Sequence, residues 1–320
     1  MQVSLIDSEI ILLFVVASYI AWGIGSNDET MMIATSGSSM SVNRLALIGA
    51  MATFAGAVFC GQFVEETIGR GILTITATSR IGLIIVIATA SWLTVVSYFG
   101  WPISTSHSTV GAVIGYGIYA GGLQAINWQN MNRIFLSWIA APLLGFLLSY
   151  SFVKSFVKIG IHTEPSNSKR WLYALLLAAL LQEFWQGANN VSNATAFLSV
   201  TSEYPSISRI IGGLAIVAGL LTLGRRVLIV SGLRITRLPV FAAFGTQAVI
   251  VLLNLVGTVY GLPVSGTHIS VACLIGAGLA SKSKVDYKMC RNVFLYWFLT
   301  LPGAAFFSML TAYISTLIFP

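Results

Sequence analysis

The sequence predicts an all-α polytopic membrane protein made of two inverted-topology repeats that contain broken helices or re-entrant hairpins. Three observations support this fold class. The composition is too apolar for a soluble domain, two polar motifs recur in the same order half a chain apart, and equivalent loops of the two halves carry different charge. We expect the first repeat to cover residues 1–153, a cytoplasmic linker 154–170, and the second repeat 171–320.

The composition indicates an integral membrane protein. Of the 320 residues, 56% are hydrophobic and only 8% are charged, whereas a soluble domain typically carries about 25% charged residues. A spanning helix takes roughly 20 residues, so the chain has room for about ten spans or re-entrant pieces and no separate soluble domain. The net charge of +7 comes from Lys and Arg in short loops, where they fix membrane orientation. We therefore expect a multi-pass protein of the cell membrane that does not bind nucleic acid.

Ten apolar segments follow one another along the chain, and several are too short for a full crossing. The short ones flank the repeated motifs, as expected of helices that enter the bilayer and break or turn back. Such irregular backbone is tolerated at membrane depth only where protein buries it or where it lines a cavity. The segments are 10–24, 45–64, 81–99, 110–120, 134–153, 171–185, 207–223, 240–260, 269–280 and 293–319.

Two motifs appear in each half. Gly25-Ser26-Asn27-Asp28 is repeated as Gly187-Ala188-Asn189-Asn190, and Gly100-Trp101-Pro102-Ile103-Ser104-Thr105-Ser106-His107 as Gly261-Leu262-Pro263-Val264-Ser265-Gly266-Thr267-His268. The offsets are 189 − 27 = 162 and 268 − 107 = 161. A duplicated unit with polar, Gly/Pro-interrupted clusters inside apolar segments is typical of secondary transporters with a site between the repeats.

The charge of equivalent loops indicates that the repeats are inverted. Residues 65–80 contain two acids and two bases, whereas the corresponding stretch 225–237 contains four arginines and no acid. Because basic loops stay in the cytoplasm, these two loops are expected on opposite sides of the membrane. The basic linker 154–170 and the loop with Lys282, Lys284, Lys288 and Arg291 are expected on the cytoplasmic side.

The second motif predicts an oxyanion site. Proline is favoured just inside a helix start, Ser and Thr cap helices, and the free backbone N–H groups of a helix N-terminus bind anions. Two such starts facing each other would hold a tetrahedral oxyanion without a permanent countercharge. The alternative is two ordinary membrane helices whose hydroxyls bond to their own backbone. The predicted anion-binding residues are Ser104, Thr105, Ser106, Ser265, Gly266 and Thr267.

The first motif predicts a cation site. An intramembrane carboxylate is expensive and is explained by default through ion binding or proton relay. Oxygens of Asp28 and of the asparagines, together with carbonyls freed at a glycine break, suit a hard monovalent cation such as Na⁺. The alternative for Asp28 is a helix cap near the surface. The predicted cation ligands are Asn27, Asp28, Asn189 and Asn190, with Glu66 as a further ligand.

Five residues are auxiliary candidates. His107 and His268 occupy the same repeat position and are proton-relay groups, anion donors or packing residues, while no third ligand at metal spacing accompanies them. Glu183 lies about one helical turn before Gly187 and is either a further site carboxylate or a protonated hydrogen-bond donor. Asn193 and Gln247 complete the auxiliary set.

These motifs closely resemble the inorganic phosphate transporter (PiT) family, whose halves each carry a GANDVANA-like and a GLPVSTTH-like segment. The resemblance also includes Glu66-Thr67-Ile68 and Gly224-Arg225-Arg226-Val227, so it covers essentially the whole chain. It implies an inverted-repeat helical bundle, usually dimeric, that couples inward phosphate movement to sodium or protons. The chain departs from the family pattern at Met31, Asn190, Ile229, Gln247 and Gly266, and each difference removes a charge or a ligand oxygen. Fewer carboxylates imply fewer or weaker cation sites.

The sequence thus predicts a secondary active transporter that imports inorganic phosphate by cation symport, with alternating access and Na⁺ or H⁺ as coupling ion. A sulfate or other oxyanion symporter remains the alternative in substrate, and a channel is the alternative in class. No nucleophile–base–orienter set or metal triad is apparent, so we expect no enzyme activity and no cofactor. The expected partners are phosphate, sodium ions, the lipid bilayer and a second copy of the chain.

Overall fold

The computed structural model describes residues 3–26, 41–99, 101, 103–160, 168–224 and 238–318. Every predicted apolar segment falls on a described helix, and seven described helices are long and apolar enough to cross a membrane. The prediction of an all-α polytopic membrane protein is therefore confirmed. The helices are α1 (Val3–Ser26), α3 (Val42–Cys60), α4 (Gln62–Glu66), α5 (Ser79–Tyr98), α6 (Thr105–Gly121), α7 (Trp128–Lys158), α8 (Ser168–Thr201), α9 (Pro205–Gly219), α11 (Val240–Val259), α12 (Gly266–Ala280) and α13 (Tyr287–Ile318), with the shorter turns η1 (Thr67–Gly71), η2 (Gly122–Ala125) and η4 (Leu220–Gly224).

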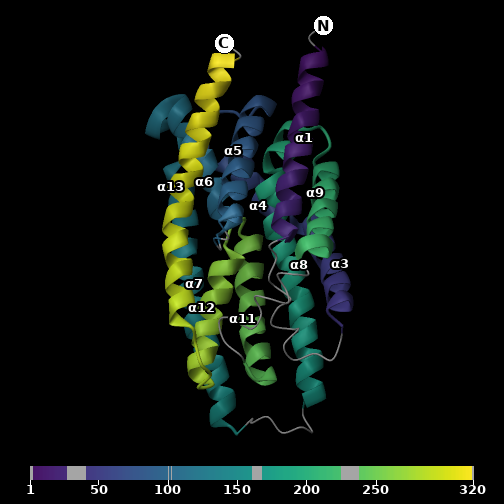
Figure 1. The fold of residues 1–320 in the computed structure, drawn as a ribbon, viewed down its shortest axis with the longest axis vertical. Helices are drawn as coiled ribbons and strands as arrows, with labels where there is room; N and C mark the ends of the chain where they lie inside the picture. The colour runs from purple at the N-terminus through teal and green to yellow at the C-terminus, as the bar shows by residue number, and fades with distance from the viewer. Residues whose placement is uncertain are drawn as a thin grey trace.

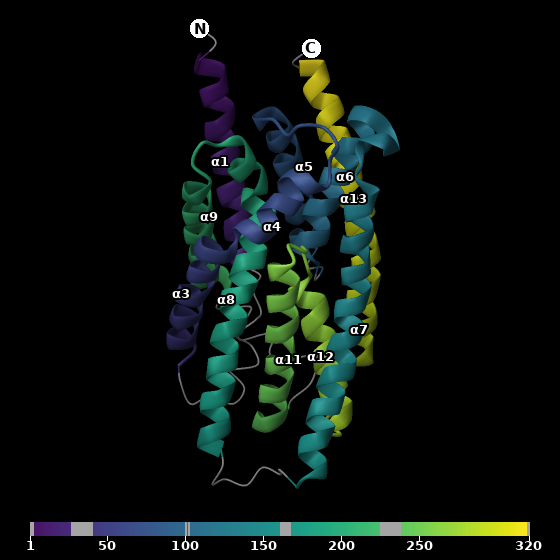
Figure 2. The ribbon, with the colours of Figure 1, turned by 180° about the vertical axis from the view of Figure 1, so that it is seen from behind.

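Corresponding helices of the two halves run in opposite directions. In Figure 1, α1 descends from the N-terminus at the top, whereas α8 rises from the bottom; α7 descends, and α13 rises to the C-terminus at the top. Figure 2 shows the same course from behind, with the end of α7 and the start of α8 at the bottom. These directions support the inverted repeat, which stays our interpretation. Both ends of the predicted linker 154–170 are helical, because α7 continues to Lys158 and α8 begins at Ser168.

Two helix–break–helix hairpins meet in the middle of the bundle. The pair α5–α6 occupies its upper part and the pair α11–α12 its lower part (Figure 1). Helix α11 ends because Gly261 adopts φ +67°, with N–H bonds from Gly261 to Thr258 and from Leu262 to Gly257, which is the Schellman pattern. The N–H of Trp101 makes the equivalent bond to Val96 after α5. The broken hairpins are thus present.

One predicted break is wrong. The motif Gly187-Ala188-Asn189-Asn190 lies inside the continuous 34-residue helix α8, so no backbone carbonyl is freed there. The glycine serves packing: a Cβ on Gly187 would overlap the backbone carbonyl of Thr53 on α3. Glycine permits this close approach of two helices because it has no side chain. The first copy of the motif, residues 27–28, lies outside the described residues.

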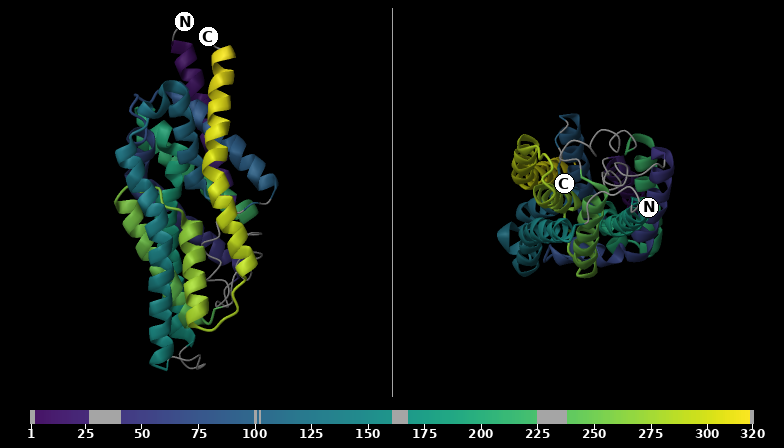
Figure 3. Two further views of the ribbon diagram at one scale, coloured as in Figure 1. Left: turned by 90° about the vertical axis from the view of Figure 1, so that its left-hand side faces the viewer. Right: turned by 90° about the horizontal axis from the view of Figure 1, so that it is seen from below.

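Helices of one half pack against helices of the other half, and glycines lie at these contacts. A Cβ on Gly25 of α1 would overlap Ile216 on α9, and a Cβ on Gly219 of α9 would overlap Trp22 on α1. Gly56 of α3 makes the corresponding contact with Phe184 on α8. The pairs α6–α13 and α7–α12 are likewise formed between the halves. Seen from below (Figure 3), α1, α3, α8 and α9 lie on one side and α7, α12 and α13 on the other.

We expect Gly56→Ala to destabilise the protein by about 1–3 kcal/mol, because the new methyl group forces two helix backbones apart. The matched control is Gly23→Ala on α1, where a Cβ would meet nothing within 4 Å. The control should be neutral or stabilising by up to about 1 kcal/mol, since Ala is the better helix former. Thermal unfolding of both variants in detergent measures the difference. Equal stability of the two variants would contradict the close contact between α3 and α8.

Candidate anion and cation site

The two predicted anion-binding segments are capped helix starts. Ser104 is the N-cap of α6, and its Oγ accepts the backbone N–H of His107 at 3.3 Å. Ser265 is the N-cap of α12, and its Oγ accepts the N–H of His268 at 3.3 Å. Both caps leave other first-turn N–H groups directed out of the helix end, where they and the helix dipole favour an anion. The predicted caps and helix starts are therefore present in both repeats.

The two helix starts touch each other. The Ser106 hydroxyl on α6 donates to the carbonyl of Val264, which directly precedes the cap of α12, at 3.0 Å. The neighbouring carbonyls are also bound: the indole N–H of Trp138 on α7 donates to Pro263 at 2.8 Å, and Asn189 on α8 donates to Leu262 at 3.0 Å. Three successive carbonyls thus bind side chains from three helices. This fixes the approach to α12 against α6, α7 and α8.

Helix α8 places two amide oxygens beside this contact. Asn189 Nδ2 donates to Thr258 Oγ1 (3.1 Å) and to Leu262 O, and Asn193 Nδ2 donates to Ser106 Oγ (3.3 Å). Both asparagines are buried, with 1% and 2% exposure, and the Oδ1 atoms of both meet no donor among the described residues. A buried carbonyl oxygen without a donor is costly. Two of them, four residues apart on one helix face, suit a bound cation.

The first-turn threonines are the accessible members of the predicted anion set. Thr105 and Thr267 are half-buried, whereas Ser104, Ser106 and Ser265 are buried. Thr105 lines a cavity of about 350 Å³ between α1 and α5, together with Ser26 and Ser97. The cavity therefore joins the start of α6 to the end of α1, where the first asparagine motif follows.

The two histidines form a symmetric aromatic stack. The rings of His107 and His268 lie 4.4 Å apart, His107 packs against Trp138 at 3.7 Å, and His268 packs against Trp297 at 3.4 Å. His107 Nδ1 lies 2.7 Å from Ser104 Oγ, which ties one ring to the cap of α6. The stack thus joins the two helix starts directly behind their caps.

The remaining predicted residues lie around this centre at different distances. Asn190 is buried on α8, and Glu183 accepts a hydrogen bond from Thr53 Oγ1 at 2.7 Å on the side of α3. Gln247 is fully buried on α11, and neither of its amide atoms meets a partner among the described residues. Glu66 lies outside the buried cluster: its side chain is 63% exposed and pairs with Arg70 at 3.3 Å. Asn27 and Asp28 lie outside the described residues.

The family model described as the phosphate transporter family matches residues 24–174 and 159–308, one stretch in each half. The chain belongs to the phosphate transporter family. This membership confirms the resemblance seen in the motifs and makes the chain a multi-pass membrane transport protein and not an enzyme.

Relatives of this phosphate transporter family member occur in Thermococcus kodakarensis and Arabidopsis thaliana. A protein named as a phosphate permease in Thermococcus kodakarensis is 27% identical over 95% of this chain and 97% of its own length. The chloroplastic inorganic phosphate transporter 2-1 of Arabidopsis thaliana is 25% identical over 93% of this chain and 70% of its own. A solved structure described as the sodium-dependent phosphate transporter has a TM-score of 0.87, 25% identity, and coverage of 97% of this chain and 100% of that one.

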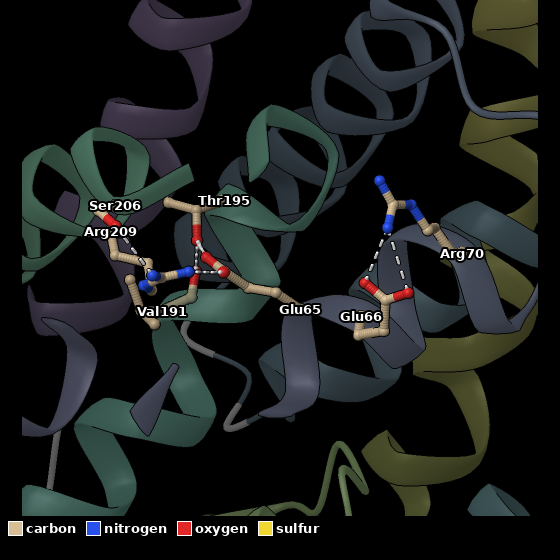
Figure 4. Close-up of polar contacts among 7 residues, drawn as sticks. All are labelled: Glu65, Glu66, Arg70, Val191, Thr195, Ser206 and Arg209. Atoms are coloured by element: carbon tan, nitrogen blue, oxygen red, sulfur yellow. Dashed lines mark hydrogen bonds and ion pairs between the residues drawn. The ribbon is translucent and has the colours of Figure 1, made fainter. Parts of the chain in front are cut away.

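This family member also contains a buried ion pair that the sequence analysis missed. Arg209 on α9 donates to Glu65 on α4 at 2.9 Å, Thr195 on α8 donates to the same carboxylate, and Arg209 also donates to Ser206 at 3.2 Å. Figure 4 shows Glu65 directed to this group, while the adjacent Glu66 points away to Arg70. Arg209 lies within the predicted apolar segment 207–223, and that intramembrane charge was the available signal.

Proposed function

We propose that the protein imports inorganic phosphate by sodium symport, with the anion at the facing starts of α6 and α12. The observation that carries the proposal is the direct contact of these two capped helix starts beside the donor-free amide oxygens of Asn189 and Asn193. The residues proposed to bind phosphate are Ser104, Thr105, Ser106, Ser265, Gly266 and Thr267.

Neutral donors suit a transported anion. The site offers hydroxyl and backbone N–H donors, and the buried arginine nearest in the chain to the α8 motif, Arg209, is already paired with Glu65. A dianion held only by neutral donors binds weakly until a cation lies beside it. The cation therefore raises anion affinity, and the anion raises cation affinity by the same factor.

Amide oxygens support sodium as the coupling ion. Hard monovalent cations take oxygen ligands, and an amide carbonyl can bind Na⁺ but carries no titratable proton near neutral pH. We place the cation at Asn189 and Asn193, with Asn27 and Asp28 from the first repeat as further ligands and Asn190 adjacent. The structure described as a sodium-dependent phosphate transporter supports the same ion.

Alternating access would follow from the repeat arrangement. Each hairpin contributes one helix start to the site, and the two hairpins enter from opposite ends of the bundle. Rocking one repeat against the other around the fixed site would open it to each side in turn. We place the basic end, with Lys154, Lys158, Lys169 and Arg170, in the cytoplasm, and we retain the homodimer as part of the proposal.

Uptake into proteoliposomes tests the substrate and the ion. Labelled phosphate and labelled sulfate are offered separately, each with an imposed sodium gradient, an imposed proton gradient, or neither. We expect phosphate uptake that depends on the sodium gradient and saturates. Sulfate uptake in place of phosphate, uptake driven only by protons, or conductance that needs no gradient coupling would overturn the proposal.

We expect Asp28→Asn to abolish the sodium dependence of uptake, because the only carboxylate of the proposed cation site would be lost. Initial rates of phosphate uptake with and without a sodium gradient measure the effect. The matched control is Asp286→Asn, which removes a carboxylate just before α13, outside the proposed site. Undiminished sodium-driven uptake by Asp28→Asn would remove Asp28 from the site.

A further inference from the structure

The two copies of the anion motif differ in hydroxyl content at one first-turn position. Thr105 begins α6, whereas the residue that begins α12, at the offset of 161, is Gly266. The Gly-x-Asn motif differs too, and here the second copy is the more polar one. Gln186 precedes Gly187 in the second copy, whereas Ile24 precedes Gly25 in the first. The second repeat thus lacks a hydroxyl on the helix start and has a polar amide on the neighbouring helix.

The structure brings these two differences together. A Cβ on Gly266 would overlap both terminal atoms of the Gln186 amide, so this amide lies directly on the first turn of α12. Glycine is therefore required at position 266 for the amide to reach it. Gln186 is only 8% exposed, and it comes from the same face of α8 as Asn189 and Asn193.

Neighbouring amides orient the Gln186 side chain. Its Oε1 accepts from Asn254 Nδ2 at 3.2 Å and from Gln182 Nε2 at 3.4 Å. Both of these bonds are accepted by Oε1, and Nε2 takes part in neither of them. With the oxygen occupied on one side, the N–H donors are left for the helix start, where an anion would accept them.

We propose that Gln186 is an anion-binding residue and that its amide replaces the hydroxyl missing at Gly266. This inference rests on the proposed function and adds a residue that no motif identifies. The amide supplies a neutral donor at the position where Thr105 supplies a hydroxyl in the first repeat. The pair Gln186 and Gly266 is thereby equivalent to the pair Ile24 and Thr105.

Three variants test whether the Gln186 amide replaces the missing hydroxyl. For each variant, the phosphate concentration that half-saturates sodium-driven uptake is measured. Gln186→Ile should raise it about tenfold to hundredfold, because a hydrogen bond to a charged group is lost. Gly266→Thr alone should also lose activity, because its side chain collides with the amide. The double variant Gln186→Ile with Gly266→Thr reproduces the first-repeat residue types and should return to within about threefold of the natural protein.

The outcomes separate the inference from the proposed function. Absence of phosphate uptake by the natural protein would defeat the proposed function itself. Normal uptake by the natural protein, together with an affinity of Gln186→Ile within about twofold of it, would overturn the role of Gln186, as would a double variant no better than Gly266→Thr. Size-exclusion profiles and thermal unfolding verify folding, and Ser199→Ala, a buried polar change on the same helix, controls for altered packing and should keep normal affinity.

Discussion

Replacing Arg209 by Met is expected to destabilise the protein by about 3–5 kcal/mol, because it leaves the Glu65 carboxylate buried without its countercharge. The two side chains are only 10% and 3% exposed, and they join α9 to α4. Within the described contacts, Thr195 would remain as a donor to that carboxylate, which does not compensate a charge. Thermal and denaturant unfolding in detergent would measure the loss.

The double variant Glu65→Leu with Arg209→Met is the control for this prediction. Removing both charges removes the desolvation penalty together with the attraction, so such replacements are often neutral or stabilising. We expect the double variant to unfold close to the natural protein. A double variant as unstable as Arg209→Met alone would mean that packing, and not the unpaired charge, is responsible.

Asn189→Ala should lower sodium-driven phosphate uptake at least about a hundredfold. The change removes the donor to Leu262 and Thr258 and one proposed cation ligand, and each buried partner left unsatisfied costs about 1–3 kcal/mol. Initial uptake rates at saturating sodium measure the effect.

Ser192→Ala is the matched control for Asn189→Ala. The Ser192 hydroxyl donates to the backbone carbonyl of Asn189 within the same helix, so uptake should stay within about twofold. Equal rates for Asn189→Ala and Ser192→Ala would contradict the anchoring role and the cation role of Asn189.

Local sequence signals predicted the helices and the two capped helix starts. Apolar runs and the Pro-x-Ser pattern depend only on neighbouring residues, so they can be recognised without knowledge of tertiary contacts. The local structure around Gly187 could not be predicted in this way. A glycine beside asparagines can break a helix or admit a neighbouring one, and only the position of Thr53 on α3 decides between them.

Contacts between residues far apart in the chain were the other feature that could not be predicted from the sequence. Glu65 and Arg209 are 144 residues apart, and nothing local to either residue identifies its partner. The contact of Gln186 with Gly266 was hidden for the same reason, although both departures from the repeat are visible once the copies are aligned. Amides on α8 also lowered its apolarity, which is why α8 is not among the seven helices identified as candidate spans.

The packing of helices of one half against helices of the other has a consequence for biogenesis. Gly111 and Gly115 of α6 are covered by Leu301 and Ala305 of α13, which is synthesised well after α6. Until α13 is inserted, α6 must therefore remain in the bilayer without this partner helix, with lipid against its small-residue face. The contact of α6 can form only when α13 is inserted, so nascent chains stalled before α13 should remain open to degradation.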